Sequence, residues 1–314
     1  MLPILSRLGR RLFDAPYLLL VLTMLFWSGN LIVGRWVAGH VPPIALGTIR
    51  WIGATLVVIG FALPFLRADW SAIRANAGIL TLLSLTSISA FNTLTYYGLQ
   101  YTEAINALLL GSTTPPFIAA WALVLFGERL TRGQLLGILI CIGGMVVIVC
   151  RGDLTALLAV RFNPGDIFIL AALAAYALYS VLLRLKPPMH PLSFLTLTMG
   201  WGSVLLLPVY ALEISTGYVM RLDATTVIAL LYVIVFPSLL AHFFFFRGVE
   251  LIGANRAAPL FYLTQVFGSA GAIIFLGERL HLYHVVGYAL VIAGITMATR
   301  RAAAIKKPSE GQPA

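Results

Sequence analysis

Long apolar runs separated by short polar segments fill most of the chain. The runs contain 16 to 25 residues, and polar residues do not alternate with apolar ones within them. A helix needs about 20 mainly apolar residues to cross a bilayer core, whereas a membrane strand needs an alternating pattern. The pattern therefore predicts ten spanning helices and no strands, over Pro16–Trp36, Pro43–Leu66, Ile73–Tyr97, Ala104–Phe126, Gln134–Val149, Ile167–Leu185, Leu192–Leu212, Thr225–Phe246, Ala257–Leu276 and Tyr283–Thr299.

The second half of the chain repeats the first. Gly-Glu-Arg-Leu ends an apolar run at Gly127–Leu130 and again at Gly277–Leu280, 150 residues later, and 15 positions are identical between Gly98–Gly144 and Gly248–Gly294 without a gap. Each copy holds five predicted spans, so the second copy must enter the membrane from the opposite side. The prediction is an all-α membrane protein with ten transmembrane helices as two inverted five-helix repeats, which is typical of secondary transporters.

The repeat defines the expected domain boundaries. We expect the first repeat over residues 16–149 and the second over residues 167–299, joined by a linker at 150–166. Residues 300–314 are basic and then rich in small and turn-forming residues, so they are expected to form a disordered cytoplasmic tail.

Charge sets the expected orientation. Only 10% of residues are charged, against about 25% in soluble domains, and the net charge is +10. If the N-terminus is cytoplasmic, 15 Lys and Arg residues lie on that side and 5 on the other, with Arg50 inside a helix. This positive-inside bias predicts an inner (plasma) membrane protein with both termini cytoplasmic. No basic cluster interleaves with stacking aromatics, so no nucleic-acid partner is expected.

Several short motifs in order resemble a known family. They are Trp27–Asn30 in the first run, Arg50–Trp51 in the second, Tyr96–Thr102 before the fourth, and the two Gly-Glu-Arg-Leu blocks. Over about Leu20–Val149 and Ile167–Thr299 the chain resembles the EamA-type transporters of the drug/metabolite transporter superfamily. The resemblance implies ten helices, an inverted repeat, and export or exchange of small metabolites.

The chain departs from the family pattern at one place. A proline often stands 13 residues before the glutamate, as Pro115 does before Glu128, but Gln265 takes that place before Glu278. We therefore expect the fourth helix to open at Pro115-Pro116 and the ninth to stay continuous, with Gln265 offering a side-chain amide.

Arg50 is the sharpest candidate for substrate binding. It lies about seven residues into the second predicted helix, roughly 10 Å deep at about 1.5 Å per residue. A membrane arginine is costly, so it usually faces a cavity or a partner. It is either a fixed cation for a substrate carboxylate or a structural arginine that binds helix-end carbonyls, and the intermediate depth slightly favours the structural interpretation.

Further polar and aromatic groups occupy similar depths in both copies. Aromatic faces with a few hydrogen-bonding groups suit small amphipathic ligands, although membrane Trp and Tyr more often anchor at the interface. In the fourth helix the hydroxyls beside the prolines have two interpretations. They either line an opening in the helix or bond the backbone carbonyls that the prolines leave unpaired at a kink. The candidate substrate-binding residues are Trp27, Asn30, Arg50, Asn92, Tyr96, Thr113, Thr114, Tyr176, Tyr179, His242, Tyr262 and Gln265.

The remaining candidate functional residues are histidines and charged residues at helix ends. His242 is the only histidine expected inside a helix, where it either couples a proton or, more simply, bonds a neighbouring helix. His281 and His284 are expected near the outer surface and too few to make a metal site. The residues Glu128, Arg129, Glu278 and Arg279 are expected to cap helix ends or to gate.

The sequence lacks the motifs that other classes of membrane protein need. A lipid-modifying prenyltransferase needs clustered aspartates, and a membrane serine protease of the Gly-x-Ser-x-Gly type needs a motif that this sequence lacks. A passive channel would need a charge ring or a carbonyl filter. We therefore expect a secondary transporter of small polar or amphipathic metabolites such as amino acids, working by alternating access. We expect no enzyme activity, cofactor or metal. Expected partners are the solute and membrane lipid, and small-xxx-small pairs are also compatible with a homodimer.

Overall fold

The computed structural model describes residues 14–128, 131–153 and 163–305, and within these ranges the chain is helical without a strand. Predictions for Arg129, for linker residues 154–162 and for tail residues 306–314 fall outside the described ranges. The elements in order are α2 (Pro16–Trp36), α3 (Pro43–Ala68), α4 (Trp70–Ala75), α5 (Ala77–Ser84), η1 (Leu85–Ala90), α6 (Phe91–Tyr101), α7 (Ala104–Gly111), α8 (Thr114–Phe126), α9 (Arg132–Val149), α11 (Pro164–Leu182), η2 (Leu183–Leu185), α12 (Pro191–Ser215), α13 (Ala224–Val233), η3 (Ile234–Leu240), α14 (Ala241–Ile252), α15 (Ala254–Ala257), η4 (Ala258–Tyr262), α16 (Leu263–Leu276) and α17 (Leu282–Ile305).

The fold is that of an all-α, multi-pass membrane protein. Among the described residues, seven helices are long and apolar enough to span a bilayer, and α7 with α8 makes an eighth if this bent pair is counted as one span. The last two predicted runs are shorter apolar helices, Leu260–Leu276 and Leu282–Met297. Length and composition thus confirm seven to eight spans among the described residues, and the predicted ten stays a prediction.

Two helices extend beyond the boundaries expected from the sequence. The linker was expected to reach residue 166, but α11 already begins at Pro164, where the fixed φ of proline suits the first helical position. Asn163 caps this helix, because its side-chain oxygen accepts the Gly165 N–H at 2.8 Å. At the other end, α17 continues to Ile305, past the expected tail boundary at residue 300.

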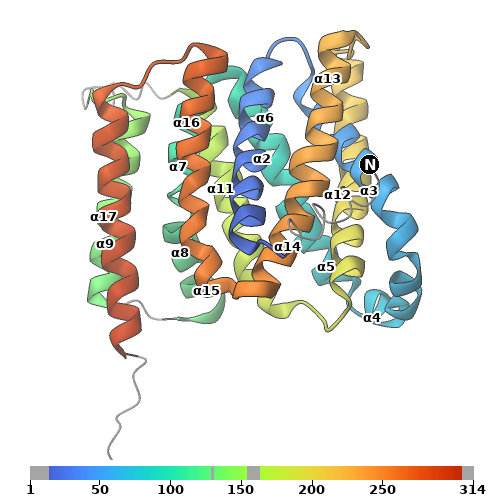
Figure 1. Cartoon of the computed structure of the whole chain (residues 1–314), viewed down its shortest axis with the longest axis horizontal. Helices are drawn as coiled ribbons and strands as arrows, with labels where there is room; N and C mark the ends of the chain where they lie inside the picture. Colours follow the sequence, from blue (N-terminus) through green and yellow to red (C-terminus); the bar gives the residue numbers. More distant parts are fainter. Residues whose placement is uncertain (1–13, 129–130, 154–162, 306–314) are drawn as a thin grey trace, which may run out of the picture.

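Helices from the two halves pack against each other throughout the molecule. Helices α9 and α17 lie side by side at one end, and α3 and α12 pair at the other (Figure 1). Between them, α2 packs on α14 and α16, and α11 packs on α6 and α8. The α9–α17 contact needs small residues, because a Cβ on Gly144 would lie 2.5 Å from the Gly287 carbonyl oxygen.

Two long helical segments contain a π-helical insertion that sequence patterns do not predict. They are η1, between α5 and α6, and η3, between α13 and α14. In η3, Pro237 has no N–H to donate, so the regular ladder is interrupted. The freed carbonyls are satisfied by side chains: Asn92 Nδ2 donates to Ser87 O at 3.2 Å, and Ser238 Oγ donates to Val233 O at 2.7 Å. Such insertions often mark functional sites.

Candidate functional site

A buried polar network surrounds Arg50. Its Nε donates to Ser238 Oγ at 2.6 Å, and its Nη1 donates to Asn92 Oδ1 at 3.0 Å and to Tyr96 Oη at 2.9 Å. Tyr96 in turn donates to Asn30 Oδ1 at 2.8 Å. The network therefore joins α2, α3, α6 and η3, and it draws on both halves of the chain.

Two of the three partners of Arg50 lie in or next to the π-helical insertions. Asn92 is the second residue after η1, and Ser238 lies inside η3. Asn92 and Ser238 each donate a hydrogen bond to a backbone carbonyl of their own helical segment. This leaves Asn92 Oδ1 and Ser238 Oγ oriented to accept from the guanidinium. Each insertion thus fixes the orientation of one side chain, Asn92 or Ser238, as well as the local backbone.

The guanidinium has no counter-ion among the described residues. The side chain is only 3% exposed, and its three hydrogen bonds go to neutral groups. None of the four described salt bridges includes Arg50, and its Nη2 makes no hydrogen bond within residues 14–128, 131–153 and 163–305. The Trp51 ring lies 4.3 Å from Arg50 Cζ and provides a cation–π contact. A buried unpaired charge is costly, so this site favours an anion.

Aromatic residues adjoin the network on one side. Trp27 Nε1 donates to Pro237 O at 3.2 Å, and His242 Nδ1 lies 3.2 Å from the same oxygen. The Trp27 ring also stacks on Phe261, with 5.8 Å between ring centroids. The carbonyl that binds Trp27 and His242 belongs to η3, next to Ser238. The predicted residues Trp27, Asn30, Arg50, Asn92, Tyr96 and His242 thus form one contiguous group.

Tyr176 and Tyr179 form a separate aromatic pair on α11. Their ring centroids lie 5.6 Å apart, and Tyr176 lies 4.9 Å from Phe91 on α6. No hydrogen bond in the described structure joins this pair to Arg50. Tyr176 keeps 38% of its surface exposed, so its ring remains accessible.

The interruption expected in the fourth helix is present. Helix α7 ends at Gly111, α8 begins at Thr114, and the two are bent by 46°. Both neighbouring hydroxyls bond back to their own chain, with Thr113 Oγ1 donating to Leu110 O and Thr114 Oγ1 to Gly111 O, each at 2.7 Å. Thr114 thereby satisfies the Gly111 carbonyl that Pro115 leaves without an N–H donor, and both hydroxyls stabilise the bend.

Helix nine is not the continuous α-helix that the sequence predicts. It begins as α15, passes through the 3₁₀ segment η4, and becomes α16 at Leu263. With its amide nitrogen directed at the Tyr262 and Phe261 carbonyls, at 3.0 Å each, Gln265 accepts from Ser112 Oγ at 3.1 Å. The amide therefore satisfies the irregular backbone of η4 and ties it to the bend between α7 and α8.

The two Gly-Glu-Arg-Leu blocks share one backbone geometry. Gly127 and Gly277 both adopt the left-handed region, with φ of 65° and 68°, as helix-ending glycines commonly do. The following N–H groups donate to equivalent carbonyls, from Glu128 to Ala122 O and from Glu278 to Ala272 O.

The carboxylates of these blocks differ. Glu278 caps α7, because its oxygens accept the N–H groups of Ala104 and Ile105 at 2.8 and 2.9 Å. Glu128 instead pairs with Arg184 in an exposed position, and this guanidinium holds the pKa of the Glu128 carboxyl below its usual range. Arg279 is exposed.

One histidine prediction is wrong. His284 is fully buried in α17 rather than near the surface, and its Nε2 lies 2.8 Å from Asn106 Oδ1. The turn between His281 and His284 directs the ring inward, since the His281 N–H donates to His284 Nδ1. The described residues hold no group of three or more His, Cys, Asp or Glu side chains placed for a metal.

Sequence patterns missed Ser238 as a partner of Arg50. A serine in an apolar run is usually a packing residue, so its type gives no signal. The one available signal is Pro237, which removes a backbone donor inside a predicted span.

Comparisons with known proteins agree on one family. A family model described as the EamA-like transporter family matches residues 15–150 and 163–300. "Uncharacterized transporter YyaM" of Bacillus subtilis (strain 168) is 25% identical over 90% of this chain and 93% of its own length. "Probable amino-acid metabolite efflux pump" of Salmonella typhimurium (strain LT2) is 24% identical over 88% and 92%. One solved crystal structure covers 93% of this chain and 99% of its own, with a TM-score of 0.58 at 18% identity, which supports the fold.

Proposed function

The chain belongs to the EamA-like transporter family, and we propose that it is a secondary transporter that exports or exchanges small metabolites bearing a carboxylate, such as amino acids. The family and the names of the relatives indicate a transporter and not an enzyme. We place it in the inner (plasma) membrane with both termini cytoplasmic, as the positive-inside bias favours.

The observation that carries the substrate proposal is the buried guanidinium of Arg50, for which the described residues provide no counter-ion. A carboxylate that reached Nη2 would neutralise the charge and form a charge-assisted hydrogen bond. The neutral partners Ser238, Asn92 and Tyr96 hold the guanidinium in place before the solute arrives. Rings of Trp27 and Phe261 nearby offer contact area for an apolar side chain.

Two inverted halves are the proposed framework. The packing supports this: if α2 corresponds to α11, then the contacts of α2 with α14 and α16 correspond to those of α11 with α6 and α8. The π-helical insertions η1 and η3 also begin 149 residues apart. Pairs α3–α12 and α9–α17 would lie on the pseudo-two-fold axis, since each pairs equivalent helices.

The two Glu blocks support alternating access. Glu278 caps α7, whereas Glu128 is held in an exposed ion pair with Arg184. We infer that the equivalent carboxylates take turns: each caps a helix when its own end of the transporter is closed and is released when that end opens. The structure then corresponds to the state closed at the Glu278 end.

Flux in sealed vesicles tests the function directly. Purified protein in proteoliposomes preloaded with an unlabelled amino-acid panel should take up labelled amino acids by counterflow, with saturation. Product analysis in detergent should show the labelled compounds unchanged. Protein-free vesicles give the leak rate, and equal uptake in both, across the whole panel, would contradict the proposal.

Cysteine labelling tests the inverted repeats. In a background with Cys141→Ala and Cys150→Ala, single changes Arg132→Cys and His281→Cys place reactive groups after the two blocks, and both positions are exposed. We expect a membrane-impermeant maleimide to label Arg132→Cys from the cytoplasmic side and His281→Cys from the outside. Labelling of both from one face would exclude opposite orientations of the two halves.

Gln265→Leu tests whether helix nine contributes to the site. The change removes the hydrogen bonds to Ser112 and to the η4 carbonyls, so we expect reduced thermal stability by about 1–3 kcal/mol, because buried carbonyls are left unpaired. If the amide also faces the solute, the counterflow KM rises about twofold to tenfold, as a hydrogen bond worth about 0.5–1.5 kcal/mol predicts. An unchanged KM in a folded variant would assign Gln265 to packing alone.

A further inference from the structure

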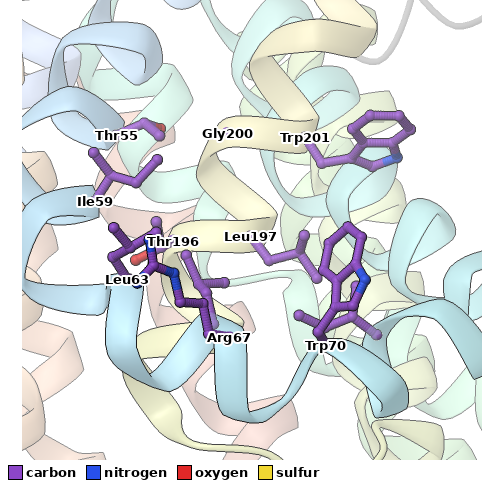
Figure 2. A pocket seen from close by; sticks show the side chains of 11 residues that line it. Thr55, Ile59, Leu63, Arg67, Trp70, Thr196, Leu197, Gly200 and Trp201 are labelled. Carbon is purple, nitrogen blue, oxygen red and sulfur yellow. The ribbon is translucent and has the colours of Figure 1, made fainter.

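An apolar groove runs between α3 and α12, where α3 gives way to α4 (Figure 2). Its volume is about 580 Å³. Every fourth residue of α3 lines it, which puts Thr55, Ile59, Leu63 and Arg67 in one stripe along the helix. In Figure 2 this stripe lies on one side, and the indole rings of Trp70 and Trp201 lie on the other.

Among the described residues that line the groove, Arg67 is the one that carries a charge. It is exposed, and it makes no ion pair or hydrogen bond with the residues that the structure describes. The neighbouring acid, Asp69, is engaged elsewhere, because its Oδ2 accepts the backbone N–H of His190 at 2.9 Å. The guanidinium is therefore available to an external anion.

Two further features favour a molecule with both a polar head and an apolar chain. Thr196 borders the groove and is 2% exposed, and its hydroxyl is buried without a hydrogen-bond partner among the described residues. Trp70 begins α4 and is 56% exposed, as expected of an indole at a membrane–water interface. Trp201 is 43% exposed and lies deeper, within the spanning part of α12. From Arg67 the groove continues along apolar side chains to Thr55, within the spanning part of α3.

We propose that the groove binds one anionic phospholipid, with its phosphate at Arg67 and one acyl chain along the α3 stripe. The glycerol ester region would lie near the unpartnered Thr196 hydroxyl. A second copy of the chain fits less well, because its apolar surface would bury Arg67 without a counter-charge. Since α3 and α12 come from different halves of the chain, the lipid would contact both.

Native mass spectrometry of the full-length protein tests the site, using phosphatidylglycerol and phosphatidylcholine with identical chains. The wild type should bind one phosphatidylglycerol in preference to phosphatidylcholine. Arg67→Gln should weaken phosphatidylglycerol binding about fivefold, as expected for one cation near an anionic headgroup, and leave phosphatidylcholine unchanged. Leu63→Trp, which fills the groove but keeps Arg67, should weaken both lipids.

The matched control is Arg74→Gln, which removes an exposed cation of α4 outside the groove. It should leave phosphatidylglycerol binding unchanged, and all variants should keep the wild-type unfolding midpoint. Equal losses in Arg67→Gln and Arg74→Gln would mean that surface charge alone attracts the lipid, and equal binding of both lipids by the wild type would mean annular lipid only. A dimer mass that Leu63→Trp abolishes would assign the groove to a second copy, and each of these results overturns the proposal.

Discussion

Arg50→Gln is expected to lower counterflow of carboxylate-bearing solutes by at least about tenfold. A hydrogen bond to a charged group is worth about 1.5–3 kcal/mol, and about 1.4 kcal/mol is a factor of ten. The amide analogue of the same amino acid, which has no negative charge to neutralise, should lose much less. The measurement is the ratio of transport of the two solutes in wild-type and variant proteoliposomes.

Two variants separate this role from a structural one. Arg50→Lys keeps the charge but cannot bond Ser238, Asn92 and Tyr96 together, so we expect partial recovery of the carboxylate preference. Arg35→Gln is the matched control, because Arg35 donates to the Leu99 carbonyl at 2.8 Å at a helix end. It should affect stability and leave the ratio unchanged. An equal loss for both solutes in a well-folded Arg50→Gln protein would return Arg50 to a purely structural role.

On the alternating-cap proposal, Glu278→Gln is expected to open the end of the transporter at which Glu278 caps α7. The carboxylate accepts two N–H groups at the positive end of α7, and glutamine loses the charge and one of the acceptors. Losing a charge-assisted hydrogen bond favours the open state by about 1.5–3 kcal/mol, or about tenfold or more in population. Ala104 lies beneath this cap and is fully buried, so the maleimide labelling rate of Ala104→Cys, in the background lacking Cys141 and Cys150, should rise by a similar factor.

Glu128→Gln is the matched control from the other block. Its carboxylate pairs with Arg184 in an exposed position, and exposed pairs contribute about 0–1 kcal/mol. We therefore expect little change in labelling at Ala104→Cys. If Glu128→Gln and Glu278→Gln raise the labelling equally, the two blocks do not stand in different states, and the alternating-cap proposal fails.

Much of the fold could be read from local patterns. The apolar runs identify the membrane helices because each run must bury its backbone polar groups within one helix. The breaks at Gly111–Thr114 and at Gly127 were also predictable, because proline and glycine impose local backbone geometry. The start of helix nine was not, since the sequence predicts a continuous helix there while residues 258–262 form the 3₁₀ segment η4.

The candidate site was likewise predictable only in part from local sequence. Sequence spacing alone nominated Arg50, Asn92 and Tyr96, because charged and amide groups inside apolar runs are conspicuous. Their mutual bonding and the role of Ser238 could not be predicted, since Ser238 lies 188 residues from Arg50 and a π-helical insertion sets its direction.

The sequence by itself determined that this protein lies in a membrane, that its second half repeats the first, and that Arg50 is the charge inside an apolar run. Composition and local sequence patterns are enough for these three conclusions. Tertiary structure alone decided which neutral groups surround Arg50 and that no counter-ion lies beside it in the part of the chain that the structure describes. It also decided that two identical Gly-Glu-Arg-Leu blocks bind different partners. The physical reason is that a hydrogen-bond partner is chosen by helix packing across the two halves, and identical local sequences meet different neighbours there.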